Sequence, residues 1–528
     1  MLVRVNQLVT AGAPASTVGI IRPAVTESSG MTTAQADEPH LQRSISARQL
    51  SMIAVGGAIG TGLFLASGSA IAQAGPAGAL LGYAIMGLAV YCMMQSLGEM
   101  ATQLPIPGSF EAYADRFVDP SLGFAAGWNY WLSWTITLAA ELVAGAMIVQ
   151  FWFPHANTTL WAIAFFVLLL GLNWMTVKAY AEAEYWFAGI KVITIIVFLA
   201  VGLLLICGGF GGESVGFQNW TLKDAPSGRS APFVGGFIGV LSVFMVAGFS
   251  FQGTEGVGLA AAETADPGRN VPRAIRSVFW RILLFYVGAI FVIGMLVGFN
   301  SPYLLNGNES HIAYSPFTLV FERVPHIGYY AASMMNAVIL TAVLSCGNSA
   351  FYVATRMLHA MACAGQAPKH FSSVNRRGVP VPALLATGLV GALAFFSSYV
   401  GDQKIYQLLY NASSLTGFLI WLGIAICHLR FRRAWVSQGR RVEDLRFRAK
   451  FYPYGTWLSL LLFIAVLFGA NASVFSATPF SWFDVVTSYL MIPVFVLLYL
   501  VHKWINKTRL VPLLDCRFDL PAEDSSES

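Results

Sequence analysis

Long apolar segments separated by short polar ones recur along most of the chain. A helix that crosses a membrane needs about 20 mostly apolar residues, because it must span a hydrocarbon layer about 30 Å thick. Twelve segments meet this requirement, and Pro, Gly and charged clusters mark their boundaries. They are residues 48–72, 76–104, 121–149, 159–176, 184–207, 234–260, 278–299, 329–361, 382–400, 405–429, 455–475 and 483–505. The pattern predicts an all-α polytopic membrane protein with twelve transmembrane helices.

The composition supports this prediction and excludes several classes of protein. Of the 528 residues, 56% are apolar and only 11% are charged, whereas a soluble domain carries about 25% charged residues. The 13% of aromatic residues argue against a disordered chain. The six cysteines form neither a CxxC metal pattern nor a disulfide framework, and the spans contain no nucleophile–base pattern. We therefore expect no enzyme, no cofactor, no metal and no nucleic-acid partner.

Lys and Arg residues are distributed unevenly between alternate loops. If the N-terminus is cytoplasmic, 26 of the 31 Lys and Arg residues fall on the cytoplasmic side, and Lys191 falls within a span. The remaining ones, in outside loops, are Lys223, Arg229, Arg323 and Lys404. Cytoplasmic loops of membrane proteins are enriched in basic residues. The asymmetry therefore predicts that both termini are cytoplasmic.

The chain divides into a membrane domain and two polar ends. Residues 1–40 are rich in Ala, Thr and Ser without periodicity, so we expect a disordered cytoplasmic tail that is not a cleaved signal peptide. Met31 is then a candidate start of translation. We expect the membrane domain over residues 41–510 and a second, solvated cytoplasmic tail over 511–528. We interpret the Lys and Arg residues of the basic loop 430–450 as the positive charge that keeps this loop on the cytoplasmic side and so orients the chain in the membrane.

Two spans contain glycine-dense segments near their middle. Four glycines fall within 56–62 in the first span and four within 248–258 in the sixth. Glycine costs a helix about 1 kcal/mol relative to Ala, and unpaired backbone is tolerated in lipid only where it lines a cavity. Two broken helices five spans apart are typical of an inverted-repeat transporter. We predict a 5+5 repeat, about 48–207 and about 234–429, with two extra helices at about 455–505; the alternative is that these glycines only allow close packing.

A broken helix exposes main-chain groups that suit a zwitterion. Its N–H end favours a carboxylate and its C=O end favours an ammonium group, so two such ends together complement an α-amino acid. The N–H groups near 58–62 are expected to bind the carboxylate, and carbonyls around 249–252 the α-ammonium. The candidate substrate-binding residues are Ala58, Ile59, Gly60, Thr61, Gly62, Glu141, Phe249, Ser250, Phe251, Gln252, Thr254 and Glu255.

Few ionisable residues lie within the spans, and each is costly in lipid unless it is paired or hydrated. For Lys191 in the fifth span, we weigh a proton-coupling role against a permanent ion pair with a carboxylate. Glu255 could bind a cationic substrate side chain, carry the proton or cap the unwound segment, and Glu141 is a second candidate for these roles. Glu263 is expected to form a gating or loop salt bridge at the cytoplasmic end. Glu99 is expected at the surface near the inner mouth.

Other polar and aromatic residues in the spans are expected to have structural roles. Trp128, Trp131 and Trp134 recur every three residues in the third span, which indicates a packing or interfacial stripe rather than a ligand site. Ser345 and Asn348 in the eighth span are expected to join helices.

Several motifs resemble those of the amino acid permeases of the amino acid–polyamine–organocation superfamily. They are GGAIGTGLF (56–64), QAGP (73–76), SLGEM (96–100), GWNYW (127–131), AEYWF (183–187) and DP (266–267). The likeness extends from about residue 41 to about residue 505. Within this family, four further segments resemble bacterial lysine-specific permeases: FSFQGTE (249–255), VFWRILLFY (278–286), SPFTLVF (315–321) and NAVILTAVLS (336–345).

The resemblance implies a proton-coupled transporter that imports L-lysine across the bacterial inner membrane by alternating access. It also implies that Lys191, Glu255 and Glu263 match positions that the family uses for coupling and substrate handling. The expected partners are L-lysine, protons and membrane lipid. Two alternatives stay open: a broader cationic or neutral amino acid permease or exchanger, and a lysine sensor that restrains a regulatory membrane protein.

Overall fold

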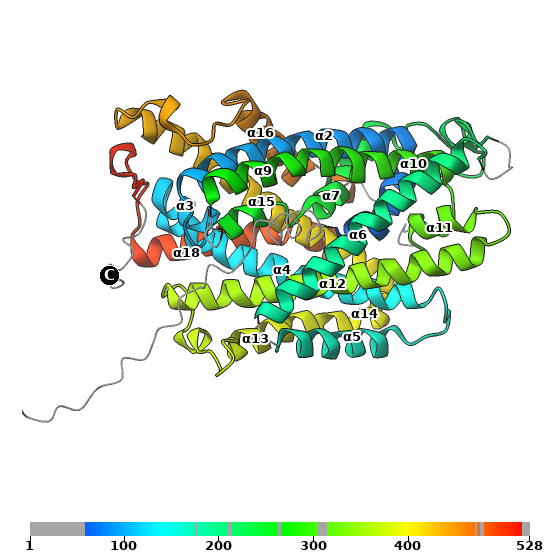
Figure 1. Ribbon diagram of the computed structural model, residues 1–528, viewed down its shortest axis with the longest axis horizontal. Helices are drawn as coiled ribbons and strands as arrows, with labels where there is room; N and C mark the ends of the chain where they lie inside the picture. The colour runs from blue at the N-terminus through cyan, green and yellow to red at the C-terminus, as the bar shows by residue number, and fades with distance from the viewer. Residues whose placement is uncertain are drawn as a thin grey trace, which may run out of the picture. The chain divides into compact units, whose positions relative to one another are not determined.

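The computed structural model describes residues 59–519 except 175–176, 210–213, 262–263, 265, 305–313, 470–471 and 476–479. The expectations for residues 1–58, including the tail at 1–40, therefore lie outside the described residues. The described residues are mostly helical (Figure 1). The α-helices are α2 (Ser67–Gln103), α3 (Phe110–Phe117), α4 (Pro120–Val149), α5 (Thr158–Asn173), α6 (Val177–Ile206), α7 (Gly236–Phe251), α8 (Gly256–Ala260), α9 (Pro267–Arg281), α10 (Gly288–Leu296), α11 (Pro316–Glu322), α12 (Gly328–Cys363), α13 (Val381–Gly391), α14 (Ser397–Val400), α15 (Asp402–Ser437), α16 (Tyr454–Gly469), α17 (Trp482–Tyr489) and α18 (Met491–Asn506).

Short elements of other types complete the fold. Two strands, β1 (Lys223–Asp224) and β2 (Arg229–Ser230), pair antiparallel. The π- and 3₁₀-helices are η1 (Gly62–Ala66), η2 (Gln218–Trp220), η4 (Ile282–Val287), η5 (Lys369–Ser372), η6 (Ala392–Phe396), η7 (Val442–Asp444), η8 (Ala472–Phe475) and η9 (Leu513–Asp515).

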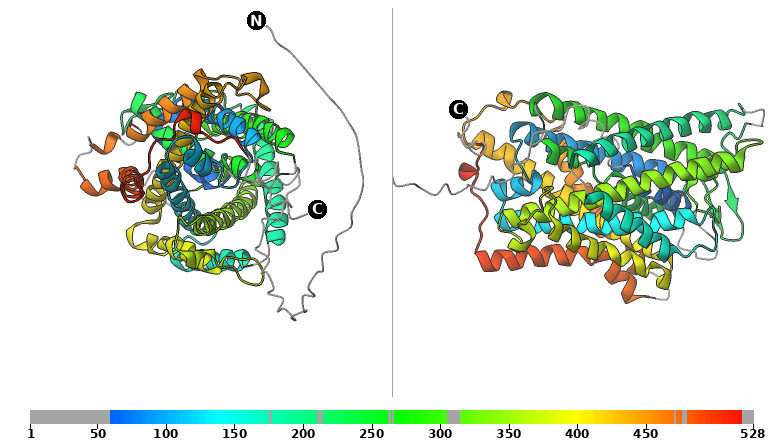
Figure 2. Two further views of the ribbon diagram at one scale, coloured as in Figure 1. Left: turned by 90° about the vertical axis from the view of Figure 1, so that its left-hand side faces the viewer. Right: turned by 60° about the horizontal axis from the view of Figure 1, so that its bottom comes forward.

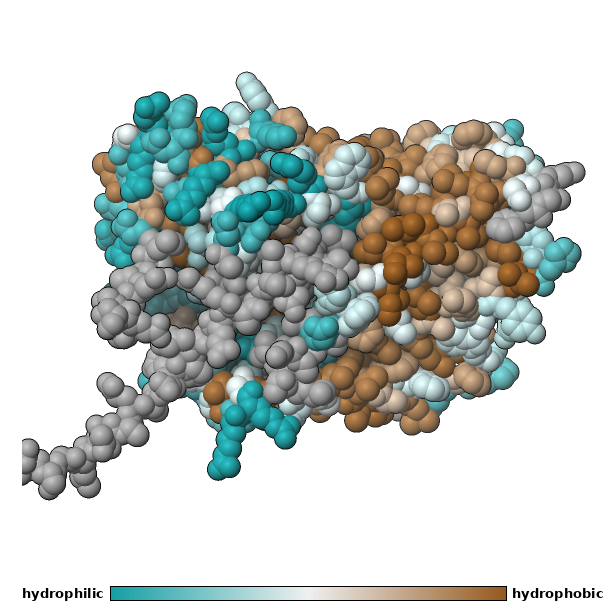
Figure 3. Space-filling model, viewed as in Figure 1, coloured by the Kyte–Doolittle hydropathy of each residue, from teal (hydrophilic) through white to brown (hydrophobic). Residues whose placement is uncertain are grey.

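The helices are long and apolar enough for a membrane protein. Seven qualify as membrane spans among the described residues, or eight if the bent pair α17 and α18 counts as one span. Three shorter apolar helices accompany them: Thr158–Asn173, Val381–Phe396 and Tyr454–Gly469. Figure 3 shows apolar surface around α6 and α10, with hydrophilic residues gathered toward the end that carries α3. The prediction of an all-α polytopic membrane protein is therefore confirmed, whereas the number of twelve spans stays a prediction.

Helix α2 contains a break that separates two predicted spans. Gly75 has a φ of 72°, a conformation that residues with a side chain rarely adopt, and Pro76 follows it. A Cβ at Gly75 would lie 2.7 Å from the carbonyl oxygen of Pro232. The break coincides with the boundary that the sequence predicts between residues 72 and 76.

Helix α7 ends in the middle of the predicted sixth span. Its last residue is Phe251, residues 252–255 follow without regular helix, and α8 begins at Gly256. Gly253 has a φ of 89°, which favours glycine. The interruption predicted for the sixth span lies here. Of the first span, the structure describes residues from Ile59 onward, with η1 beginning at Gly62.

Helix α4 is the most buried of the candidate spans. In its most apolar window 94% of the residues are buried, and it packs against α12, α15, α3 and α5. The element η1 packs against α7, which also packs against α2 and α15. Figure 2 shows these long helices end-on in its left view. This packing brings the start of η1 and the end of α7 close together beside α4.

The residues after α18 form a packed segment. The N–H of Val511 donates to the carbonyl of Val118 at 2.9 Å, and Gln438 donates to the carbonyl of Cys516 at 2.7 Å. Cys516 and Phe518 are only 4% and 7% exposed. Residues 511–519 therefore contact the rest of the protein through Cys516 and Phe518, while five of these nine residues are exposed. Residues 520–528 lie outside the described part of the chain.

Helix α3, which lies between two spans, carries a buried carboxyl group. Glu111 is 8% exposed. Its burial disfavours the charged form, and the negative charge of Asp115 adds to this effect, so the pKa of Glu111 is raised to about 7. The charged form of Glu111 therefore destabilises the fold.

Replacing Glu111 by glutamine is expected to stabilise the purified protein at pH 8 and to have little effect at pH 4. At pH 8 the wild-type carboxylate is charged in a site that disfavours charge, and one unit of pKa shift is worth about 1.4 kcal/mol, so the gain is at most about 3 kcal/mol. The gain declines as the pH falls from about 7 toward the ordinary value of 4.5, below which the carboxyl is protonated in both states. Thermal unfolding in detergent across this range measures it. The same difference in Tm at pH 4 and pH 8 would contradict the prediction.

Candidate functional site

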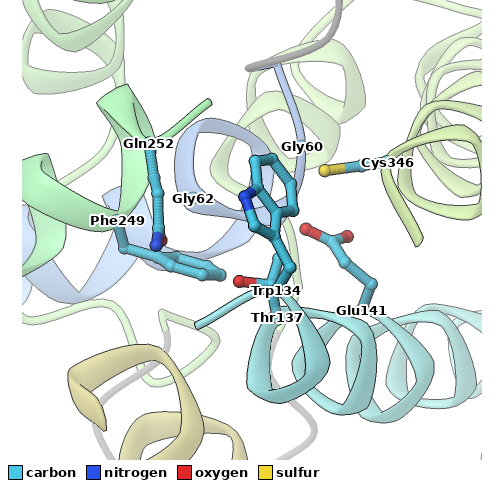
Figure 4. Close-up of a pocket in the computed structure, with 8 residues that line it drawn as sticks. All are labelled: Gly60, Gly62, Trp134, Thr137, Glu141, Phe249, Gln252 and Cys346. Atoms are coloured by element: carbon cyan, nitrogen blue, oxygen red, sulfur yellow. The ribbon is translucent and has the colours of Figure 1, made fainter. Parts of the chain in front are cut away.

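A cavity lies where the end of α7 meets the start of η1, beside α4 and α12 (Figure 4). The empty space among its lining residues, open solvent included, measures about 280 Å³. It is lined by Gly60, Gly62, Trp134, Thr137, Glu141, Phe249, Gln252 and Cys346.

Two glycines allow η1 to approach its neighbours. A Cβ at Gly60 would lie 2.6 Å from Sγ of Cys346 and 2.8 Å from Oε1 of Glu141. A Cβ at Gly62 would lie 2.6 Å from Cα of Ser250, which is main chain and cannot move aside like a side-chain tip. Any larger residue at these positions would therefore close the site or push the helices apart.

The helix that starts at η1 binds a carboxylate at its beginning. The N–H group and the hydroxyl of Thr61 both donate to Oε1 of Glu141, at 3.3 and 3.0 Å. The partial positive charge of a helix N-terminus favours such a partner. Glu141 is 2% exposed, and its other oxygen, Oε2, has no hydrogen-bond partner among the described residues. The site therefore holds a carboxylate at Thr61 and retains one buried acceptor.

Gln252 has a fixed orientation at the other end of the cavity. Its amide group donates to the hydroxyl of Ser133 and to the carbonyl of Ser413 at 3.2 Å. Its Oε1 accepts the hydroxyl of Ser413 at 2.7 Å. Both amide hydrogens and the carbonyl are thereby used, so Gln252 joins the end of α7 to α4 and α15.

Glu255 is not among the residues that line the cavity. It is 1% exposed, and it accepts the N–H of Gly253 at 3.1 Å and the indole N–H of Trp421 at 3.1 Å. The neighbouring Thr254 accepts a hydrogen bond from the buried guanidinium of Arg281 at 3.0 Å. Of the three interpretations of Glu255, this geometry favours the cap of the unwound segment.

Lys191 lies in α6 with no exposed surface. Its Nζ is 3.9 Å from Oε1 of Glu184, which is 1% exposed. Lys191 is also close enough to Glu141 for a Coulombic interaction. The structure thus provides the carboxylate that the ion-pair interpretation of Lys191 requires, and it brings the lysine near the cavity.

The remaining predicted site residues lie beside the cavity or outside the described residues. Ser250 hydrogen-bonds with Tyr83 at 2.8 Å, and the ring of Phe251 packs edge-on against that of Tyr83, so both face away from the cavity lining. Ile59 is buried next to Gly60. Two predicted residues lie outside the described part of the chain: Ala58 and Glu263.

Sequence reasoning missed three of the lining residues: Trp134, Thr137 and Cys346. Trp134 packs edge-on against Tyr130, as the interpretation of the stripe predicts, and it also lines the cavity. The other two members donate their indole N–H groups within the fold. Trp134, Thr137 and Glu141 follow one another by three and four residues, which places them on one helix face. This spacing, anchored on Glu141, was the signal that could have found them.

Glu99 is a buried partner of basic groups, so its expected surface position is wrong. It has no exposed surface, and its carboxylate accepts hydrogen bonds from Arg432 and from the N–H of Ala449 at 2.7 Å. Nε2 of His428 lies 3.2 Å away. Glu99 therefore joins α2, α15 and the basic loop.

Comparison with known proteins agrees with a helical membrane protein. The amino acid permease family model matches residues 49–514. The lysine-specific permease of Escherichia coli (strain K12) is 47% identical over 487 residues, which cover 92% of this chain and 98% of that protein. The lysine-specific permease of Lactococcus lactis subsp. cremoris (strain MG1363) is 45% identical over 94% of this chain and 96% of its own. The histidine permease of the same organism is 46% identical over 90% and 98%.

These matches extend over nearly the whole length of both partners in each comparison. Together with the apolar helices, they make this chain a multi-pass membrane protein whose relatives are transporters rather than enzymes. The chain therefore belongs to the amino acid permease family.

Proposed function

We propose that this permease imports L-lysine together with protons across the bacterial inner membrane by alternating access. The observation that carries the proposal is the cavity between the end of α7 and the start of η1, where Thr61 binds a carboxylate and Glu141 retains a buried acceptor. Lysine carries one carboxylate and two ammonium groups, and a buried ammonium must meet a carboxylate or several carbonyls. The names of the two lysine-specific relatives support this choice of substrate.

In the proposed complex, the substrate carboxylate replaces that of Glu141 at the N–H groups of residues 58–62. Glu141 is thereby released from Thr61 and pairs with the side-chain ammonium of the substrate. Carbonyls around 249–252 accept the α-ammonium, because the partial negative charge at the C-terminal end of a helix favours a cation. Glu255 and Thr254 hold the unwound segment in shape, and Glu263 acts as a gating residue at the cytoplasmic end.

Lys191 is the proposed proton carrier. Lys191 has no exposed surface and lies near the cavity, where it interacts with the Glu141 charge. The inside-negative membrane potential adds about 2.3 kcal/mol per charge per 100 mV to the uptake of a cation. Lysine import would therefore be driven by both the pH gradient and the potential.

The proposed architecture has twelve spans, a 5+5 inverted repeat and both termini in the cytoplasm. Several features support it: the break at Gly75 divides one long helix into two spans, and three shorter apolar helices and the bent pair α17 and α18 add to the number. The prevalence of Lys and Arg in alternate loops supports the orientation. The apolar surface of Figure 3 is the proposed contact with membrane lipid.

Proteoliposomes that contain the purified protein are expected to take up labelled lysine several-fold faster when an inward pH gradient is imposed. The gradient supplies protons to the outward-facing Lys191. Initial rates with and without a protonophore measure the effect, and empty liposomes are the control. If the rate of uptake does not depend on the pH gradient, the proposal of proton symport is wrong. If the protein shows no lysine counterflow, lysine is not its substrate.

The 46% identity to a histidine permease favours a second candidate, a broader cationic or neutral amino acid permease or exchanger. Competition of labelled lysine uptake by histidine, arginine, ornithine and phenylalanine separates the two. Strong inhibition by histidine would favour the broader permease. The remaining alternative is a lysine sensor that restrains a membrane protein. A variant that no longer transports lysine but still controls this membrane protein would favour the sensor.

A further inference from the structure

Helix α6 carries an acidic residue that was not a candidate for the site. Glu184 precedes Lys191 by about two helical turns, so both side chains share one face of the helix. Oε1 of Glu184 and Nζ of Lys191 are 3.9 Å apart, and the two side chains are 1% and 0% exposed. A pair of opposite charges therefore lies inside the protein, away from solvent.

A second helix holds the Glu184 carboxylate in place. Ser345 of α12 donates its hydroxyl to both carboxylate oxygens, at 3.0 and 3.2 Å, and is itself 1% exposed. The next residue, Cys346, lines the cavity. The pair of Glu184 and Lys191 is thus fixed between α6 and α12, directly behind the proposed substrate site.

The other ionisable groups near Lys191 come from α4 and α12. Glu141 of α4 interacts with Lys191 through Coulombic forces, and the thiol of Cys346 is close to Lys191 and to both carboxylates. Helix α10, which packs against α6, has no titratable residue, and Glu322 of α11 is exposed. Glu184 is a carboxylate in ion-pair contact with Lys191.

We propose that Glu184 is a positioning residue for proton coupling, which stabilises the protonated form of Lys191 and so sets the pH at which this lysine is loaded. The inference rests on the proposed function, in which Lys191 carries the proton. A negative charge at this distance stabilises an ammonium much more strongly in a dry site than in water. Without it, the burial that disfavours an ammonium group is offset only by the remaining neighbours of Lys191, among them Glu141. Loading then requires a more acidic medium.

Replacing Glu184 by glutamine tests this role through the pH profile of lysine uptake in proteoliposomes. The midpoint of the profile is expected to move toward acid by about one pH unit or more, a tenfold loss of proton affinity. Glu184→Asp keeps the charge and is expected to restore the wild-type midpoint at least in part. An unchanged midpoint in Glu184→Gln would overturn the proposal.

A matched control lies on the same helix. Glu182 is exposed, and its carboxylate accepts the indole N–H of Trp186, so Glu182→Gln removes the same charge and is expected to leave the profile unchanged. If Glu184→Gln fails to fold, Ser345→Ala is the second variant. It keeps both charges but releases the carboxylate, and a smaller acid shift is expected. A wild-type profile in a folded Ser345→Ala variant would then overturn the proposal.

Failure of this inference can be distinguished from failure of the proposed function. If the wild-type protein shows no lysine counterflow, the substrate is wrong. If it exchanges lysine but its net uptake does not depend on pH, the coupling role of Lys191 is wrong. If wild-type uptake depends on pH and Glu184→Gln behaves identically, the positioning role of Glu184 alone is wrong.

Discussion

Replacing Glu141 by glutamine is expected to lower lysine uptake by about 100-fold or more. The amide still accepts a hydrogen bond from Thr61, so the start of η1 stays capped. It cannot neutralise the second ammonium of a buried lysine, and removing one partner of a buried charge pair costs about 3–5 kcal/mol. Uptake of labelled lysine at saturating and limiting concentrations measures the loss.

A matched control for this variant is Glu322→Gln on α11, where the carboxylate is exposed. This change is expected to leave uptake near the wild-type rate. Lysine-dependent thermal stabilisation in detergent gives an independent measure of binding and should vanish in Glu141→Gln. Wild-type affinity for lysine in a folded Glu141→Gln variant would show that another group meets the side chain of the substrate.

Alanine in place of Gly62 is expected to abolish transport while the protein still inserts into the membrane. The added Cβ would lie 2.6 Å from Cα of Ser250, so η1 and α7 must separate at the cavity. Overpacking of this kind costs about 1–3 kcal/mol, and the shift falls where substrate is proposed to bind. Gly60→Ala is expected to reduce uptake less, because its nearest neighbours are the side chains of Cys346 and Glu141.

Gly171→Ala provides the matched control for these glycine variants. Gly171 is also helical, in α5, and a Cβ there meets nothing within 4 Å. It is expected to fold and to transport like the wild-type protein, with helix propensity slightly improved. The amount of protein in the membrane and the rate of lysine uptake are measured for each variant. Full transport by Gly62→Ala would mean that the interruption of the helices is not the substrate site.

Local patterns in the chain were sufficient to predict the apolar helices and the interruption in the sixth span. Segment length, apolar content and glycine density act through the solvation of backbone and side chains, so they can be read without knowledge of neighbouring helices. Gln252 and Phe249 were expected at the site because they lie at the predicted interruption of the sixth span, and both line the cavity. The family motifs also predicted membership of the amino acid permeases.

The partners of the buried charges could not be predicted in this way. The sequence made Glu255 the first candidate and Glu141 the second, but Glu141 lines the cavity and Glu255 accepts the indole N–H of Trp421 of α15. Glu99 was expected at the surface, but in the fold its carboxylate accepts a hydrogen bond from Arg432 of α15. Each of these outcomes depends on contacts between residues 80 or more positions apart.

The sequence by itself determined that this chain is a helical membrane protein of the permease family with glycine-weakened spans. Hydrophobic length and backbone propensity are properties of short segments, and lipid enforces them wherever the segment lies. Only the tertiary structure decided which carboxylate borders the cavity, that Trp134 joins it, and that Ser345 of α12 binds the Glu184 carboxylate beside Lys191. A buried charge is stabilised by the groups that packing places within a few ångströms, and the periodicity of one helix cannot specify a partner on another helix.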